Sequence, residues 1–330
     1  MAIRTTLTER FGLDYPVVSA PMAQVSGGRL AAAVSDAGGL GLVGGGYGDP
    51  GWLREELSVA RAGTKRPWGV GLITWRATRE TVELALSFEP HAFMLSFGDP
   101  VPHVPAIKEA GCALILQVQS VEGALAAARA GADFVVAQGT EAGGHGADSG
   151  STLPLVPAVL DAVSPTPVLA AGGIADGRGL AAALMLGAAG ALVGTRFYAC
   201  EESAGHRGAK ERLVAASGGD TRRTRVFDVV RGRGWPEPYT GRALHNPFLE
   251  RWEGREDELA AALDAEAPRF QDATAEGDFD RAMVWSGEGA DLIRDVAPAA
   301  RLLQRMGEEA EARLRSARGL LGEVREEAAG

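Results

Sequence analysis

The sequence predicts an α/β fold, a TIM-type (β/α)8 barrel followed by a mainly helical C-terminal appendage. Three observations predict it. Eight short apolar runs recur in the first 200 residues, Ala/Leu-rich stretches of helical periodicity separate most of them, and successive runs lie mostly roughly 20 to 30 residues apart. That spacing fits one strand, one helix and two short loops, which is the repeating unit of a closed parallel barrel.

The apolar runs are the expected strands, in the order Val17–Ala20, Leu40–Val43, Gly69–Leu72, Ala92–Ser96, Ala113–Val118, Phe134–Ala137, Val168–Ala171 and Ala191–Gly194. Expected helices between them include Val121–Ala130 and Gly179–Leu186. A doubly wound open sheet is the alternative, but eight units exceed its usual five or six, and no G-x-G-x-x-G opens the first helix. The glycine-dense Gly38–Gly48 straddles a strand, which favours close packing and tight turns.

One connection breaks this rhythm. Between Phe134–Ala137 and Val168 the chain inserts QGTEAGGHGADSGSTLPLVP before the next expected helix. Loops of this length are usually functional or disordered, and in a barrel they lie at the C-terminal mouth, where active sites of this fold are built.

Beyond about Arg196 the alternation stops, so we place a boundary near residues 197–205. We expect residues 1–200 to form the barrel and residues 201–330 to form an extension packed on it. The end of the extension, Pro298–Ala329, is expected to be an amphipathic helix lying on the barrel or on a second subunit of a homodimer. The tail arginines are interpreted as a solvated, salt-bridged surface rather than a phosphate clamp; they are Arg222, Arg223, Arg225, Arg231 and Arg233.

The composition excludes several classes of protein. A net charge of −10 argues against nucleic acid as a partner, because binding to phosphate backbones needs clustered Lys and Arg. The two cysteines, Cys112 and Cys200, form no C-x-x-C pair and are expected to be buried free thiols. No apolar stretch is long enough for a signal peptide or a membrane span, so we expect a cytoplasmic protein.

Two glycine-containing strand ends lie one barrel unit apart, in Ala170–Asp176 (AAGGIAD) and Val193–Phe197 (VGTRF). The loops after the seventh and eighth strands of this fold commonly form a phosphate site, because glycines let backbone N–H groups approach the oxygens. Glycines that merely turn the chain are the simpler alternative, which the match of both loops makes less attractive. The candidate phosphate ligands are Gly172, Gly173, Gly194 and Thr195.

His145 stands in EAGGHG at the expected mouth, with no apolar run beside it. Histidine titrates near neutral pH, which suits proton transfer at a substrate carbon. The other histidines are given structural or surface roles. No second ligand stands at metal-binding spacing, so no metal is expected, and an orienting role for Glu141 is an open possibility.

Five segments together resemble the nitronate monooxygenase family, formerly called 2-nitropropane dioxygenases. They are SAPMA at Ser19–Ala23, GVGL at Gly69–Leu72, QGTEAGGHG at Gln138–Gly146, AAGGIAD at Ala170–Asp176 and LVGTRF at Leu192–Phe197. The resemblance covers about the first 200 residues, and EAGGH is its most specific part. Flavin-dependent enoyl-ACP reductases and NADH:quinone reductases share these segments.

The resemblance implies FMN as the cofactor and a barrel that surrounds it. Ala20, Pro21 and Met22 would place backbone against the isoalloxazine ring, and Gln117 and Gln138 would offer polar contacts to it. Further flavin contacts would come from a set of residues in the glycine loops, namely Gly143, Gly144, Gly172, Gly173, Gly194 and Thr195.

This chain departs from the family pattern in the third strand. Many members carry Asn after Gly-Val, where this chain has Gly71, so a side-chain contact to the flavin is expected to be lost there. Gly71 would border the cofactor through its backbone alone.

The resemblance also implies an activity. An FMN-dependent nitronate monooxygenase would oxidise alkyl nitronates or nitroalkanes with O₂ to carbonyl compounds and nitrite, with His145 as the proton acceptor. One alternative is an FMN-dependent NAD(P)H:quinone or enoyl-thioester reductase in which His145 donates the proton. Another is a non-catalytic flavin-binding or phosphosugar-binding barrel.

Overall fold

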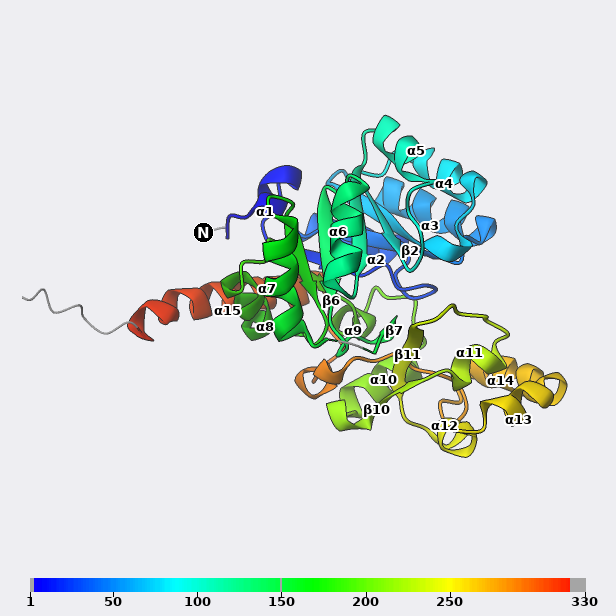
Figure 1. The fold of residues 1–330 in the computed structure, drawn as a ribbon. Coiled ribbons are helices and arrows are strands. Elements are labelled where there is room, and N and C mark those ends of the chain that lie inside the picture. The colour runs from blue at the N-terminus through cyan, green and yellow to red at the C-terminus, as the bar shows by residue number, and fades with distance from the viewer. Residues whose placement is uncertain (1–2, 149, 321–330) are drawn as a thin grey trace, which may run out of the picture.

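A parallel barrel forms the centre of the computed structural model, which describes residues 3–148 and 150–320. Its eight strands are hydrogen-bonded in the order β1-β9-β8-β6-β5-β4-β3-β2, and a bridge between Val18 and Leu40 joins the two ends (Figure 1). The strands are β1 (Val17–Ser19), β2 (Gly41–Gly46), β3 (Trp68–Ile73), β4 (Ala92–Ser96), β5 (Ala113–Val118), β6 (Phe134–Gln138), β8 (Val168–Ala171) and β9 (Gly190–Val193). The predicted (β/α)8 barrel is confirmed.

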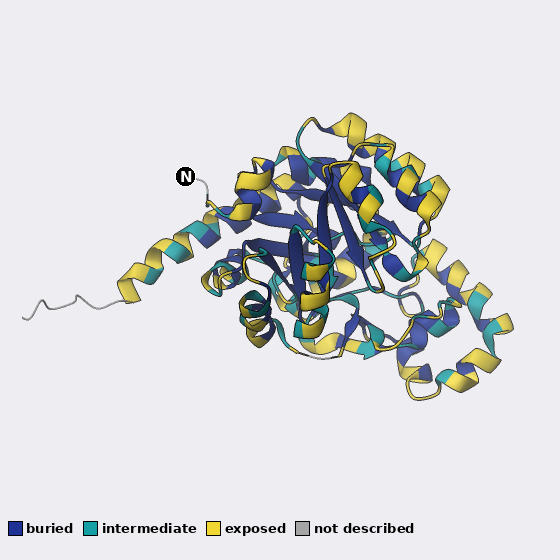
Figure 2. Ribbon diagram, turned by 45° about the horizontal axis from the view of Figure 1, so that its top comes forward, coloured by how far each residue is buried: buried dark blue, intermediate teal, exposed yellow. Residues whose placement is uncertain are grey.

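The eight apolar runs of the sequence all become barrel strands. Nearly every strand residue is buried, since the inner face fills the barrel and the outer face is covered by helices (Figure 2). The boundaries differ most at β2, which extends to Gly46 through an irregularity between Gly44 and Gly46.

Seven helices cover the outside of the barrel. They are α2 (Gly28–Asp36), α3 (Pro50–Gly63), α4 (Arg79–Leu86), α5 (Val104–Glu109), α6 (Val121–Arg129), α7 (Thr152–Val163) and α8 (Gly177–Met185). Several begin at a side chain that accepts a hydrogen bond from the first turn, as Asp49, Thr78 and Ser120 do. Such caps satisfy N–H groups that have no partner within the helix.

A short N-terminal helix, α1 (Thr6–Phe11), closes one end of the barrel. Its Leu7 and Phe11 are buried among the side chains of the barrel interior, and the Phe11 ring stacks on that of Phe134 with centroids 5.9 Å apart. Phe134 is the first residue of β6, so α1 covers the N-terminal end. The C-terminal end is left for the loops that build the site.

The ring of helices is completed by α15 (Ala299–Ala317), far along the chain. The last barrel strand, β9, is followed directly by the short four-residue helix α9 (Thr195–Tyr198). The place of a longer outer helix is taken by α15, which lies against α8 and α2. Its Leu302, Leu303 and Met306 are buried with Leu30 and Leu180 in one apolar cluster. The helix expected over Pro298–Ala329 thus ends at Ala317, before the turn η4 (Arg318–Leu320), and residues 321–330 lie outside the described part of the chain.

The segment between α9 and α15 is mainly helical, as expected, and lies at the mouth of the barrel (Figure 1). Its helices are α10 (Arg207–Ala215), α11 (Val226–Val230), α12 (Pro247–Trp252), α13 (Glu256–Ala261) and α14 (Leu263–Glu276), with short turns η2 (Gly218–Asp220) and η3 (Glu288–Leu292); η1 (Thr74–Arg76) follows β3. The division of the chain at residue 200 stays a prediction.

The appendage also holds two strands that sequence periodicity did not predict, β10 (Thr221–Thr224) and β11 (Tyr239–Leu244). They form a three-stranded antiparallel sheet in the order β10-β11-β7, where β7 (Gly144–Ala147) belongs to the long loop after β6. The sequence TRRT of β10 lacks the alternation of apolar and polar residues that marks a strand. This sheet fastens the appendage to the loop that carries His145.

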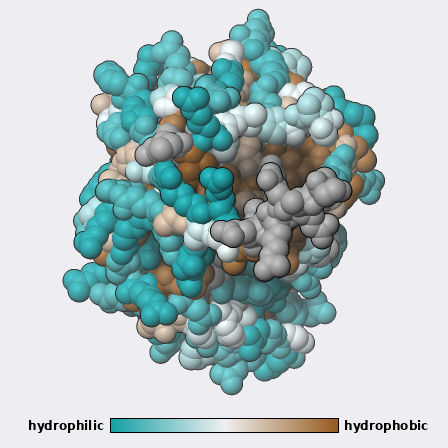
Figure 3. Space-filling view, turned by 90° about the vertical axis from the view of Figure 1, so that its left-hand side faces the viewer, coloured by the Kyte–Doolittle hydropathy of each residue, from teal (hydrophilic) through white to brown (hydrophobic). Residues whose placement is uncertain are grey.

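Figure 3 shows one face of the molecule that is mostly hydrophilic where it is raised and apolar in its hollows. In the described residues, no helix combines the length and apolar character needed to cross a membrane.

The position of α15 leads to a stability prediction. Leu303 is fully buried, so Leu303→Ala should lower the free energy of unfolding by about 2 to 5 kcal/mol through lost apolar contact and a residual cavity. Urea denaturation followed by circular dichroism measures it. Met185→Ala on α8 is the control, because Met185 is 68% exposed and its truncation should change the value by less than about 0.5 kcal/mol. Equal losses in the two variants would contradict the assignment of α15 to the barrel ring.

Candidate active site

A cavity of about 420 Å³ opens at the C-terminal ends of the barrel strands. It is lined by every residue that the sequence singled out for the cofactor or for catalysis. These are Ala20, Pro21, Met22, Gly71, Gln117, Gln138, Gly143, Gly144, His145, Gly172, Gly173, Gly194 and Thr195. The structure therefore brings together side chains and backbone from six different strand ends and from the long loop.

The segment after β1 runs across the mouth close to β3. A Cβ at Gly71 would lie 2.3 Å from Pro21 Cγ, so any larger residue there would displace the proline ring. Pro21 therefore packs directly against the backbone of Gly71.

Three glutamine side chains form a chain of hydrogen bonds in the cavity wall. Gln117 Nε2 and Gln119 Nε2 both donate to Gln138 Oε1, at 3.1 and 2.8 Å. Gln138 Nε2 in turn donates to the carbonyl oxygen of His145 at 3.0 Å. The amide of Gln138 is thus fixed in orientation, and it ties the histidine loop to β5 and β6.

The two glycine loops fit an anionic group. Gly172 and Gly173 have φ angles of +110° and +69°, and a Cβ at position 172 would lie 2.7 Å from Thr152 Oγ1. Within residues 3–148 and 150–320, no acceptor takes the N–H of Gly172 or Gly173. Gly194 precedes the first turn of α9, where Thr195 Oγ1 accepts from the N–H of Gly287 at 3.0 Å. Open backbone N–H groups beside a helix start are what a phosphate binds.

His145 is held on β7, opposite Gly241 of β11. Its Nε2 lies 2.8 Å from Asp228 Oδ2, and its ring stacks on Trp235 with centroids 3.6 Å apart and planes 6° apart. The side chain is only 8% exposed. A carboxylate can only accept, so Nε2 carries the proton and Nδ1 is left with a free lone pair.

Burial dominates the electrostatics of this histidine. Removal from water lowers the pKa of His145, the hydrogen bond and charge of Asp228 raise it in part, and the charges of Arg231 and Arg223 lower it again. The net shift of the pKa is downward, so His145 is neutral at pH 7. A neutral imidazole with one free lone pair can accept a proton.

Asp228 is the functional residue that sequence reasoning missed. It lies on α11 of the appendage, 83 residues from His145, and no local pattern connects the two. Glu141, for which the sequence left a role in orienting His145 open, instead binds Thr152. Its carboxylate accepts hydrogen bonds from the N–H and Oγ1 of Thr152 at 3.0 Å. Glu141 therefore fixes the start of α7.

The tail arginines need a correction. Arg225 pairs with Glu237 at the surface as expected, but Arg223 is largely buried and donates to the carbonyls of Thr140, Gly146 and Thr240. Burial, with help from Arg242, lowers the pKa of Arg223 to about 10. The solvated-surface interpretation is wrong for Arg223, because it holds the histidine loop. It is also wrong for Arg231, whose side chain is 15% exposed and lines the cavity.

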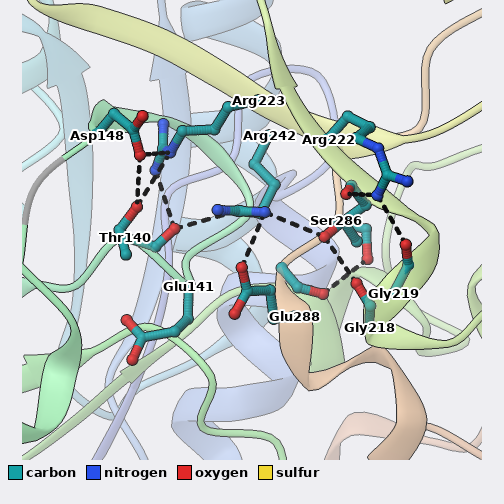
Figure 4. Close-up of polar contacts among 12 residues, drawn as sticks. Thr140, Glu141, Asp148, Gly218, Gly219, Arg222, Arg223, Arg242, Ser286 and Glu288 are labelled. Carbon is teal, nitrogen blue, oxygen red and sulfur yellow. Dashed lines mark hydrogen bonds and ion pairs between the residues drawn. The ribbon is translucent and has the colours of Figure 1, made fainter.

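A second arginine holds the same loop. Arg242 Nε donates to the Thr140 carbonyl at 3.1 Å, and its Nη1 pairs with Glu288 at 2.9 Å. Figure 4 shows both guanidinium groups turned towards Thr140 from neighbouring strands of the appendage sheet. Arg223 and Arg242 therefore both hold the loop before His145 in place.

Aromatic rings form the outer wall of the cavity. Trp235 contacts the rings of Tyr47, Trp75, Phe97 and Tyr239 at centroid distances of 5.2 to 6.2 Å, and its Nε1–H donates to Tyr47 Oη at 2.9 Å. This bond joins the appendage to the end of β2. His206, to which the sequence gave a structural or surface role, caps α10 and also lines the cavity.

Metal-binding clusters and thiols are the other groups that could carry chemistry. The described residues contain no group of three or more His, Cys, Asp or Glu that could hold a metal ion. Cys112 and Cys200 are buried free thiols, as expected, and burial raises the pKa of Cys112 to about 11 and that of Cys200 to about 12.

The sequence profile of nitronate monooxygenases matches residues 4–83 and 75–309, which is most of the chain. The chain belongs to the nitronate monooxygenase family. It is an oxidoreductase, and this family of enzymes is in general flavin-dependent.

Individual members of the family and related structures resemble the chain over nearly its whole length. A nitronate monooxygenase of Neurospora crassa is 35% identical over 91% of this chain and 90% of its own. A nitroalkane oxidase from Streptomyces ansochromogenes superimposes with a TM-score of 0.80 at 31% identity, covering 94% of this chain and 99% of that one. FabK from Thermotoga maritima superimposes with a TM-score of 0.85 at 34% identity, covering 97% and 100%.

The buried histidine should make stability depend on pH. Its pKa is lower in the folded state, so below the unfolded value near 6.5 the unfolded chain binds the extra proton and stability falls with pH. Between pH 7 and 5, His145→Asn should lose less free energy of unfolding than the unsubstituted protein. Urea titrations at each pH measure this, with His245→Asn, on the exposed surface, as the control. Identical pH profiles for His145→Asn and the unsubstituted protein would contradict the shift.

Proposed function

We propose that the protein is an FMN-dependent nitronate monooxygenase that oxidises alkyl nitronates and nitroalkanes with O₂ to carbonyl compounds and nitrite. The observation that carries the proposal is the pairing of buried His145 with Asp228 in a cavity that also holds the open glycine loops. A proton acceptor and a phosphate cradle that line one cavity fit a flavin enzyme that acts on a carbon acid.

FMN would be held by this chain's own groups. The N–H groups of Gly172 and Gly173 and the first turn at Gly194 and Thr195 would bind its phosphate, and the segment Ala20–Met22 would border its ring. When bound, FMN supplies the electron transfer between the nitronate and O₂.

His145 would handle the proton of a neutral nitroalkane. The free lone pair of Nδ1 takes the proton from the carbon that bears the nitro group, which leaves the nitronate anion. Asp228 then stabilises the positive imidazolium through the bond at Nε2. Trp235 covers one face of the ring and keeps water from it.

The protein should purify with one non-covalent FMN per chain. The reason is that the glycine loops offer open N–H groups for a single phosphate beside a cavity of about 420 Å³. Mass spectrometry of the supernatant after denaturation identifies the nucleotide. FAD there, or no flavin after reconstitution, would count against the proposal.

Replacing His145 by Asn should leave FMN bound and lower turnover of neutral nitroalkanes by about a hundred- to ten-thousand-fold. Turnover of the pre-formed nitronate should fall far less, because that anion has already lost its proton. Oxygen consumption with each substrate form measures the difference. Equal losses on the two forms would remove the proton-acceptor role from His145. Rapid flavin bleaching by NADH in the absence of nitronate would instead indicate a reductase.

A further inference from the structure

We propose that Arg231 forms an anion subsite in the cavity, where it binds the planar, two-oxygen group of the substrate beside His145. The ligand class is a small organic anion such as a nitronate or a carboxylate. The inference rests on the proposed function for the identity of the reacting group, but anion binding itself can be measured without turnover.

Arg231 follows α11 directly and lines the cavity. Its side chain is 15% exposed, yet in the described part of the chain it makes no hydrogen bond. Its contacts are a loose ion pair, with Nη1 3.8 Å from Asp228 Oδ1, and the Tyr47 ring, whose centroid is 5.9 Å from its guanidinium carbon. Arg223 and Arg242 differ from it, because carbonyl and carboxylate oxygens occupy their donors.

The neighbouring carboxylate leaves Arg231 available. Asp228 Oδ2 is engaged by His145, and Oδ1 is buried with no hydrogen-bond partner among the described residues. At 3.8 Å, Arg231 stabilises the charge of Asp228 without spending its own N–H donors on it. The N–H groups of the Arg231 guanidinium are therefore available to an acceptor in the cavity.

Geometry selects the shape of that acceptor. The guanidinium is a planar fork whose two parallel N–H groups match the two oxygens of a carboxylate or a nitro group. Tyr47, which lines the cavity and contacts Arg231, adds aromatic surface beside the guanidinium. Because Arg231 and His145 face the two oxygens of the same carboxylate, an anion on Arg231 lies next to the imidazole.

This placement would also assist the proposed proton transfer. A cation next to the nitro oxygens stabilises the negative charge that develops there as the carbon loses its proton. Arg231 would thus lower the barrier for a base whose own pKa is held down by burial. His145 accepts the proton, and Arg231 holds the oxygens on which the electron pair of the broken C–H bond comes to rest.

The test uses benzoate and its neutral counterpart benzamide, titrated into the flavin-loaded protein by calorimetry. Arg231→Gln should weaken benzoate binding roughly ten- to a hundredfold, as expected for lost hydrogen bonds to a charged group, and leave benzamide binding unchanged. Arg231→Lys, which keeps the charge but not the fork, should lose less. Arg225→Gln is the matched control, since Arg225 lies on the same segment and pairs with Glu237 at the surface.

Several results would overturn the subsite. These are unchanged benzoate affinity in Arg231→Gln, an equal loss in Arg225→Gln, an equal loss for benzamide, or no binding of benzoate to the unsubstituted protein. Failure of the proposed function gives a different pattern, in which nitronate is not oxidised while benzoate binding still depends on Arg231. With nitronate as substrate, Arg231→Gln should raise KM as well as lower kcat, whereas His145→Asn should spare turnover of the anion.

Discussion

The hydrogen bond between His145 and Asp228 is the contact on which the rest of the site depends. It joins a barrel loop to a helix of the appendage across 83 residues of chain. Two buried polar side chains need each other, because either one alone would be left without a partner away from water. The pairing of β7 with β11 and the arginine contacts at Thr140 bring the two parts to this distance. The appendage is therefore a structural part of the active site.

Small residues and hydrogen-bonded side-chain amides form other parts of the cavity wall. Pro21 lies against Gly71 because that strand position has no Cβ. Both polar atoms of the Gln138 side chain are hydrogen-bonded, Oε1 to Gln119 and Nε2 to the carbonyl of His145. The N–H groups of Gly172 and Gly173 have no acceptor among the described residues, so a ligand can accept their hydrogen bonds. Part of the cavity wall is thus hydrogen-bonded within the protein, whereas the glycine loops keep N–H groups for an anion.

The sequence alone predicts the barrel well because each strand is buried on both faces and appears as a compact apolar run, such as Ala113–Val118. Barrel geometry also predicts the position of His145 and of the glycines after the last two barrel strands, and the family resemblance supplies the other predicted residues that line the cavity. The sequence does not predict Asp228, Trp235 or Arg231. These residues reach the site because β10 pairs with β11 and β11 pairs with β7. Register between distant segments leaves no periodic mark in a run such as TRRT.

The late position of α15 has a consequence for how the chain is made. When the eight strands have been synthesised, Leu30, Val34 and Leu180 in the groove between α2 and α8 are still exposed to water. The helix that covers them, α15, begins about a hundred residues later in the chain. The nascent barrel must wait with that apolar groove open while the appendage folds over the mouth. Contacts of such long sequence separation form slowly, so these apolar side chains stay exposed until α15 is made and docks.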